Sequence, residues 1–310
     1  MDAPPPVAVP EPVSLRRWYV HPYNRSGYYR LASRCARALP RAGRHALAAG
    51  LARFALRCLP AERESVRRNL RRALPQADAR RLEAAVSGLF RNFARCFADL
   101  LTINRGPTAS LSRYVREVRG KEHLAAASAA ERGLIVATAH LGNWELGGRL
   151  LNRARGRAIH VVLSEEEDPA VQALLRRNAE GVHFVTREAP TTSLALLAAL
   201  RRNEIVAVQG DRGVGGRADQ LAPFFGAPAP FPIGPFFLAR ASGAPVLPAF
   251  CLLEEDATYR VCLEPPIWVR PGGEEAGLRK LVAVIERYVS AYPEQWFNFY
   301  DVWGAPRAPA

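Results

Sequence analysis

The stretch Gly133-Leu-Ile-Val-Ala-Thr-Ala-His140-Leu-Gly-Asn143-Trp144-Glu145 decides the fold of this chain. Its apolar run is typical of a buried strand, and the Gly-Asn pair after His140 is typical of a turn into a helix. The sequence therefore predicts a histidine at the carboxyl edge of a sheet, where open α/β folds bind their ligands.

His140 and Glu145 are predicted to meet across this turn. The carboxylate would orient the ring through one nitrogen, and the other nitrogen would act as a general base for a hydroxyl group. The backbone N–H groups of the turn from Leu141 to Trp144, which includes Asn143, would hold an oxyanion or a phosphate of the substrate. The alternative is a histidine with a structural hydrogen bond only, because short His-x4-Glu patterns recur by chance.

From Gly133 onward, short apolar runs alternate with amphipathic helical patterns. The patterns predict strands at 133–139, 158–163, 182–185, 204–209 and 245–252, and helices at 144–154, 168–180, 190–202, 233–242 and 274–292. Residues 258–264 are expected to add an edge strand. Such alternation predicts the α/β class, with a mostly parallel central sheet flanked by helices.

The N-terminal part has a different character. Residues 1–12 are expected to form a disordered tail, residues 13–120 a basic, helical, membrane-associating region, and residues 121–310 the α/β catalytic domain. Helices are predicted at 44–59, at 62–74 and from Asp78 onward. Leu47, Leu51 and Phe54 share one face of the first helix, and we expect such apolar stripes to pack on their own domain.

The positive charge of the chain lies in its N-terminal part. Residues 1–120 hold 23 basic and 8 acidic residues, whereas the remainder holds 20 and 21. Arginines that alternate with Leu, Phe and Trp at helical spacing favour an anionic membrane surface over nucleic acid as the partner. No signal peptide is recognised, and the longest uncharged stretch, 220–239, contains five prolines, so no spanning helix is expected there.

Further candidate substrate-binding residues are predicted at strand ends, and the cysteine content bears on whether a metal site is expected. Asp211 and Arg212 follow the predicted strand at 204–209 between glycines, and Arg187 follows a third strand, so all three are candidate substrate-binding residues. An internal Asp-Arg pair in a turn is the alternative reading for the first two. Five scattered cysteines without C-x-x-C spacing argue against a zinc site and a disulfide framework, so we expect neither a metal nor a cofactor.

The proline-rich stretch also carries a cluster of aromatic residues. Phe224, Phe225 and Phe231 are candidates for the lining of a groove that faces a hydrocarbon chain. A loop packed on the core is the equally weighted alternative.

Four motifs together carry a family resemblance. They are His140-x4-Glu145, Val66-Arg-Arg-Asn69-Leu70, Pro223-Phe-Phe-Gly226 followed by Gly234-Pro235, and Tyr292-Pro-Glu-Gln-Trp296-Phe297. In the order in which they occur along the chain, they resemble the lipid A late acyltransferase branch of the glycerolipid acyltransferase superfamily. That branch usually carries an N-terminal spanning helix, and this sequence departs from it there.

The resemblance implies a reaction and a place for it. A fatty acyl chain would move from acyl carrier protein, or from acyl-CoA, to a hydroxyl of a membrane glycolipid such as a lipid A precursor. His140 would be the base and Glu145 its orienting residue, in a peripheral or monotopic enzyme on the cytoplasmic face of the bacterial inner membrane. Lysophospholipid, mannolipid or aminolipid acceptors remain open, and a basic nucleic-acid-binding protein is the more distant alternative.

Overall fold

The computed structural model describes residues 26–103, 113–163, 181–187, 189, 191–213 and 219–304 of the 310-residue chain. The expected tail at 1–12 and the expected helix at 168–180 lie outside the described residues.

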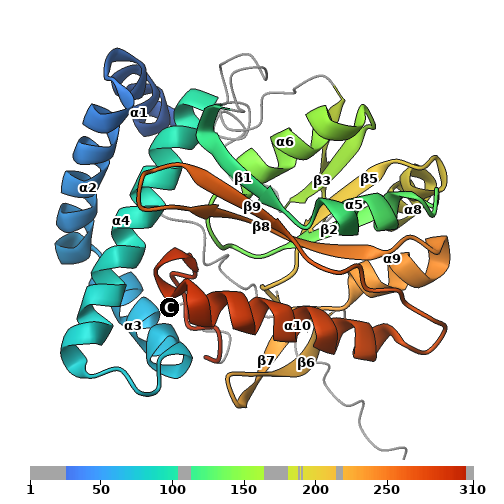
Figure 1. The fold of residues 1–310 in the computed structure, drawn as a ribbon. Coiled ribbons are helices and arrows are strands. Elements are labelled where there is room, and N and C mark those ends of the chain that lie inside the picture. The colour runs from blue at the N-terminus through green and yellow to red at the C-terminus, as the bar shows by residue number, and fades with distance from the viewer. Residues whose placement is uncertain are drawn as a thin grey trace, which may run out of the picture.

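In the described part of the chain, the central sheet has seven strands in the order β1-β9-β8-β2-β5-β3-β4 (Figure 1). The strands are β1 (Val115–Arg119), β2 (Leu134–Thr138), β3 (Ile159–Leu163), β4 (Val182–Thr186), β5 (Ile205–Gln209), β8 (Val246–Leu253) and β9 (Tyr259–Leu263). The five strands from β8 to β4 are parallel, and β9 runs antiparallel to β8. The predicted α/β class with a mostly parallel sheet is confirmed.

The position of β9 corrects one prediction. The strand expected at the edge lies inside the sheet, because β1 pairs with its outer side. The sequence of β1, Val-Arg-Glu-Val-Arg, alternates apolar and charged residues, which suits an edge strand that faces solvent. The sheet therefore begins before residue 120.

Strand β2 is buried on both faces, and its alternating side chains face two helical layers. Ile135 and Ala137 belong to the core cluster that includes apolar residues of α8, α9 and α10, whereas Leu134 and Val136 pack with Leu124 of α5. These helices are α5 (Lys121–Ser128), α6 (Trp144–Arg155), α8 (Thr192–Arg201), α9 (Gly234–Ser242) and α10 (Glu274–Ala291), followed by the short 3-10 helix η2 (Pro293–Gln295).

Four N-terminal helices pack beside the sheet (Figure 1). They are α1 (Ser26–Ala38), α2 (Arg41–Cys58), α3 (Pro60–Ala73) and α4 (Ala79–Ile103). Asp78 caps α4 as expected, since its carboxylate accepts a hydrogen bond from the Arg81 N–H at 2.7 Å. Val66 of α3 and Leu89 of α4 lie in one core cluster with Phe297 near the C-terminus.

The exposed face of α2 corrects a second prediction. Leu47, Leu51 and Phe54 do not pack on the domain; 46%, 59% and 65% of their surfaces are exposed. The helix instead buries Ala48 and Ala52, because small side chains allow its backbone to approach α4 closely. None of the described helices is long and apolar enough to cross a bilayer.

The proline-rich stretch forms a hairpin of β6 (Asp219–Phe224) and β7 (Ala227–Pro232). Its two-residue turn places Phe225 at φ 47° and Gly226 at φ 74°, as a type I′ turn requires. This ribbon packs against α10.

Candidate functional site

The carboxyl ends of β2 and β5 bring His140 and Asp211 together. The two strands are neighbours in register, Thr138 opposite Gln209, and the next residues diverge into two turns. The His140 Nδ1 lies 2.7 Å from Asp211 Oδ1, and the His140 backbone N–H donates to Asp211 Oδ2 at 3.0 Å. The prediction of a histidine at the carboxyl edge of the sheet is confirmed.

The C-terminal segment completes this arrangement. Trp296 Nε1 and Asn298 Nδ2 donate to Asp211 Oδ2 at 3.2 and 3.1 Å, and the Phe297 N–H donates to the carbonyl of His140 at 2.7 Å. No role in the site was predicted for these residues. The polar groups of Trp296 and Asn298 on either side of Phe297 were the available signal, because buried polar groups need partners.

The side-chain amide of Asn69, on α3, holds the C-terminal segment in place through three hydrogen bonds. Asn69 donates to the carbonyls of Asn298 and Tyr300 at 3.1 and 2.7 Å, and accepts from the Val302 N–H at 3.1 Å. The described C-terminal segment, at 298–302, accordingly lies against α3. Asn69 thus holds the residues that directly follow the motif at 292–297, and Val66, Leu70 and Phe297 of the two motifs share one core cluster.

The hydrogen bonds around His140 determine which of its two ring nitrogens carries the proton. Burial would raise the pKa of Asp211, but the attraction of His140, its hydrogen bonds and the charge of Arg212 hold the pKa well below its usual range. An ionised carboxylate only accepts hydrogen bonds, so Nδ1 carries the proton and Nε2 holds the lone pair. Such a tautomer is the one that a general base needs.

Burial keeps this ring neutral. Desolvation and the charge of Arg212 lower the pKa of His140 to about 4, although Asp211 acts in the opposite direction. The base is therefore deprotonated throughout the neutral range.

The lowered pKa of the His140 ring can be tested by an NMR titration. The His140 ring should titrate well below the ordinary value of about 6.5, and a His140→Gln variant identifies its resonance. Between pH 6.5 and about 4 the unfolded chain binds a proton on this ring and the folded chain does not. The free energy of unfolding should consequently fall as the pH drops through that window. A titration midpoint at or above 6.5 would contradict this description of the site.

The carboxylate that contacts Nδ1 of His140 is Asp211, whereas Glu145 was expected from the sequence to orient the ring. Residue Glu145 opens α6 and lines a pocket beside the site, with Arg149 one helical turn further along. Because Asp211 accepts from Nδ1, a second carboxylate on the other nitrogen would occupy the base itself. The carboxylate at Nδ1 thus comes from a residue that follows the neighbouring strand β5, and not from position 145.

The turn after His140 is fixed by protein contacts, which corrects two further expectations. The Gly142 and Asn143 N–H groups donate to the carbonyls of Gln295 and Cys251 at 2.9 and 2.7 Å, so these two are not donors for an oxyanion. The Asn143 side chain accepts from the Leu146 N–H and caps α6. It is buried, and it serves the helix rather than a substrate.

A buried polar network supports this cap from behind. Asn143 donates to the hydroxyl of Tyr259 at 3.1 Å, and that hydroxyl donates to Asp99 at 2.9 Å. Asp99 also pairs with Arg41 at 2.6 Å and with His45 at 3.1 Å, both from α2. The network connects α2 and α4 to the turn that carries His140.

Arg212 braces the C-terminal segment. Its Nε donates to Asn298 Oδ1 at 2.6 Å and its Nη2 to the carbonyl of Phe297 at 2.7 Å. Burial lowers the pKa of Arg212 to about 10, while Tyr300 and Asp211 raise it, so the group stays charged. Arg187 follows β4 at the same edge of the sheet and is exposed, three strands away from His140.

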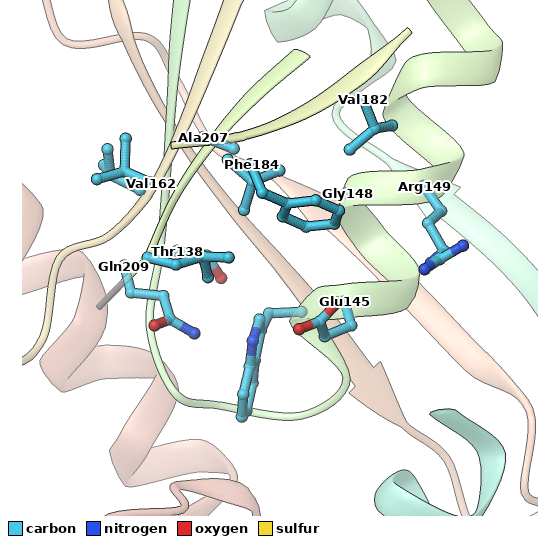
Figure 2. Close-up of a pocket in the computed structure, with 13 residues that line it drawn as sticks. Thr138, Glu145, Gly148, Arg149, Val162, Val182, Phe184, Ala207 and Gln209 are labelled. Atoms are coloured by element: carbon cyan, nitrogen blue, oxygen red, sulfur yellow. The ribbon is translucent and has the colours of Figure 1, made fainter. Parts of the chain in front are cut away.

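A pocket lies between α6 and four strands, and its empty space together with the open solvent at its mouth is about 560 Å³ (Figure 2). Its floor comes from β2, β5, β3 and β4, and its roof from the first two turns of α6. Trp144 lines it and also contacts the His140 ring edge-on, with ring centroids 5.1 Å apart. The pocket therefore begins beside the base, and its lining is mostly apolar.

The pocket does not involve the expected aromatic residues. Phe224 and Phe231 are each 1% exposed and pack edge-on against one another, and Phe224 also meets Trp296. Phe225 lies at the hairpin turn, partly buried against the same core. The groove prediction for these three residues is corrected: burial of their large rings stabilises the hairpin.

The site consists of an imidazole, a carboxylate and an apolar pocket. Within the described residues, no three His, Cys, Asp or Glu side chains gather closely enough to hold a metal ion.

Comparison with known proteins agrees with this geometry. Residues 28–304 match the model of the family described as bacterial lipid A biosynthesis acyltransferase. The chain is 27% identical to a phosphatidylinositol mannoside acyltransferase of Mycobacterium tuberculosis (strain CDC 1551 / Oshkosh) over 273 residues, 86% of this chain and 84% of that protein. It is 24% identical to the lipid A biosynthesis palmitoleoyltransferase of Escherichia coli (strain K12) over 247 residues, 76% of each.

An imidazole with a buried carboxylate partner beside an apolar pocket suits acyl transfer to an alcohol, and the residues of all three lie within the part of the chain that matches the family. The chain is an acyltransferase that belongs to the bacterial lipid A biosynthesis acyltransferase family.

Proposed function

We propose that this enzyme moves a fatty acyl chain from a thioester, carried by acyl carrier protein or CoA, to a hydroxyl of a membrane glycolipid. The observation that carries the proposal is the His140–Asp211 pair beside an apolar pocket, in a chain of this family. The pair supplies the base, and the pocket excludes water from the acyl chain.

The reaction follows from the ring's free nitrogen. His140 Nε2 takes the proton of the acceptor hydroxyl as its oxygen attacks the thioester carbonyl carbon. The tetrahedral intermediate collapses, the C–S bond breaks, and the leaving thiolate takes the proton back from His140. Asp211 stabilises the imidazolium that exists between these steps, and the charge of Arg212 favours the negative oxygen of the intermediate.

The pocket under α6, rather than the hairpin residues expected from the sequence, is the proposed binding place of the acyl chain. It lies next to His140 and is lined by apolar strand residues such as Val161 and Phe184. Each methylene buried there contributes roughly 0.8 kcal/mol. We therefore place the acyl chain in this pocket, with its thioester end toward Thr138.

The acceptor is proposed from the relatives and from charge. One relative is named as a palmitoleoyltransferase of lipid A biosynthesis, and another as an acyltransferase of phosphatidylinositol mannoside. Both names describe glycolipids, and Arg187, exposed at the same sheet edge as His140, suits an anionic group on such an acceptor. We propose a lipid A precursor.

Mass spectrometry of lipids from cells with and without the gene tests this function. Loss of one acyl chain from a lipid A species supports the proposal. Loss from a mannolipid or another lipid replaces the acceptor, and an unchanged lipid profile contradicts the function itself. Addition of the purified enzyme with acyl carrier protein or CoA thioesters then identifies the donor.

The exposed face of α2 suits an anionic membrane surface. Leu47, Leu51 and Phe54 lie exposed there beside Arg53 and Arg57, which are also exposed. Apolar side chains can enter the interface while the arginines meet anionic headgroups, each worth ~1 kcal/mol. We propose that the enzyme binds the cytoplasmic face of the inner membrane through this helix.

Substitution of all three apolar residues by serine should weaken binding to phosphatidylglycerol vesicles by at least about tenfold, since each buried side chain contributes roughly 1.5–3 kcal/mol. Vesicle sedimentation measures the effect. The control is Leu194→Ser with Leu221→Ser, two equally exposed leucines on other elements. Equal binding of both variants would exclude α2 as the membrane contact.

A further inference from the structure

The pocket runs across the strands of the sheet, so the spacing between strands gives its length. Ala207 of β5, Val161 of β3 and Phe184 of β4 lie opposite one another in register, and all three line the floor. Thr138 of β2 lines the end next to His140. From β2 to β4 there are three strand spacings of about 4.8 Å, or roughly 14 Å.

Phe184 stands at the far side of this path. Its strand, β4, is the last strand of the described sheet, so no further described strand extends the floor beyond it. Figure 2 shows Phe184 and Val182 entering the pocket from β4, opposite the helix that carries Gly148, while Thr138 and Gln209 lie at the other end. The phenyl ring therefore lies at the end of the described floor that is farthest from His140.

Gly148 leaves empty space on the α6 side of the pocket. A Cβ built on Gly148 meets no atom within 4 Å, whereas one built on Gly147 comes within 3.3 Å of the Cβ of Cys251 on β8. The two adjacent glycines thus face different neighbours: Gly147 allows α6 to pack on the sheet, and Gly148 leaves space over the floor. A Cβ at position 148 would therefore point into open space at the edge of the pocket that Gly148 lines.

We infer that Phe184 and Gly148 set the length of the acyl chain, with a saturated chain of about twelve carbons as the preferred substrate. Single bonds near 1.52 Å at angles near 111° advance an extended chain by about 1.25 Å per carbon, so ~14 Å accommodates roughly eleven or twelve carbons. Each methylene that the pocket buries raises affinity about fourfold, and a methylene beyond the wall gains nothing. The inference rests on the proposed acyl transfer.

The experiment measures chain-length preference in binding and in transfer separately. Saturated fatty acids spanning about four carbons on either side of twelve displace a fluorescent fatty acid from the full-length protein, and the matching acyl-CoA series is used for transfer. Phe184→Ala should move the optimum to chains longer by about four carbons, the length of a phenyl ring at 1.25 Å per carbon. Gly148→Leu should move it to shorter chains.

Two variants control for general damage. Val185→Ala truncates the next residue of β4, which packs against the opposite core cluster, and should leave the optimum unchanged. Gly148→Ala adds one carbon to the same helix position and should shift the optimum little. Thermal unfolding of every variant separates loss of fold from a change in preference.

The outcomes separate this inference from the proposed function. Opposite shifts in Phe184→Ala and Gly148→Leu support it. An optimum that neither substitution moves, in folded proteins that still transfer acyl chains, overturns the inference alone. Shifts in fatty acid binding without any transfer by the wild-type enzyme contradict the proposed function and still support the length assignment.

Discussion

Replacement of His140 by alanine is expected to lower acyl transfer by about 100- to 10,000-fold, because a positioned general base contributes an effect of that size. The ring holds its proton on Nδ1 toward Asp211, so only Nε2 can accept the proton of the acceptor hydroxyl. The loss should fall on kcat, since the acyl pocket is lined by other residues. Steady-state kinetics with purified protein measure it.

The matched control is a second histidine–carboxylate pair of the same sheet. His160 Nε2 lies 2.7 Å from Glu204 Oε2, away from the carboxyl edge where the proposed chemistry takes place. His160→Ala should keep most of the activity. Comparable activity in His140→Ala, with an unchanged melting temperature, would remove His140 from the mechanism.

Asp211→Asn should cost nearly as much, up to about 10,000-fold, while Glu145→Gln should cost much less. An amide in place of the carboxylate can present its NH₂ to Nδ1, which then carries the lone pair and leaves the proton on Nε2. The variant is nearly isosteric, so KM should change little while kcat falls. The ¹⁵N chemical shifts of the His140 ring report the tautomer directly.

The comparison between the two carboxylates decides the orienting residue. A larger loss in Glu145→Gln than in Asp211→Asn, with the Nδ1–H tautomer retained in the asparagine variant, would return the orienting role to Glu145. The geometry supports Asp211, which accepts hydrogen bonds from four groups of three residues, His140, Trp296 and Asn298.

Much of the α/β architecture follows from local patterns. The runs at 133–139 and 204–209 became β2 and β5, and the patterns at 233–242 and 274–292 became α9 and α10 within one or two residues. Apolar periodicity and proline or glycine boundaries are properties of neighbouring residues, so the sequence alone carries them. The charged edge strand β1 lacks such a run, and it was missed.

The hairpin and α2 show where local patterns mislead. An apolar stripe indicates that a helix has an apolar face, but it does not say what covers that face. In α2 the alanine side approaches α4 and the leucine side stays exposed, because close approach favours small residues. Likewise, five prolines excluded a helix correctly, yet the pairing of β6 with β7 depends on the turn at Phe225 and Gly226.

Local sequence patterns are sufficient to predict that His140 follows a buried strand, that parallel strands surround it and that Asp211 follows another strand. Only the tertiary structure decided that β5 lies next to β2, which makes Asp211 the partner of His140, and that the segment from Trp296 to Asn298 closes the site. Strand order depends on how crossover helices bury their faces against a common sheet. Hydrogen bonds across about 70 to 85 residues follow from that order, and local periodicity does not encode it.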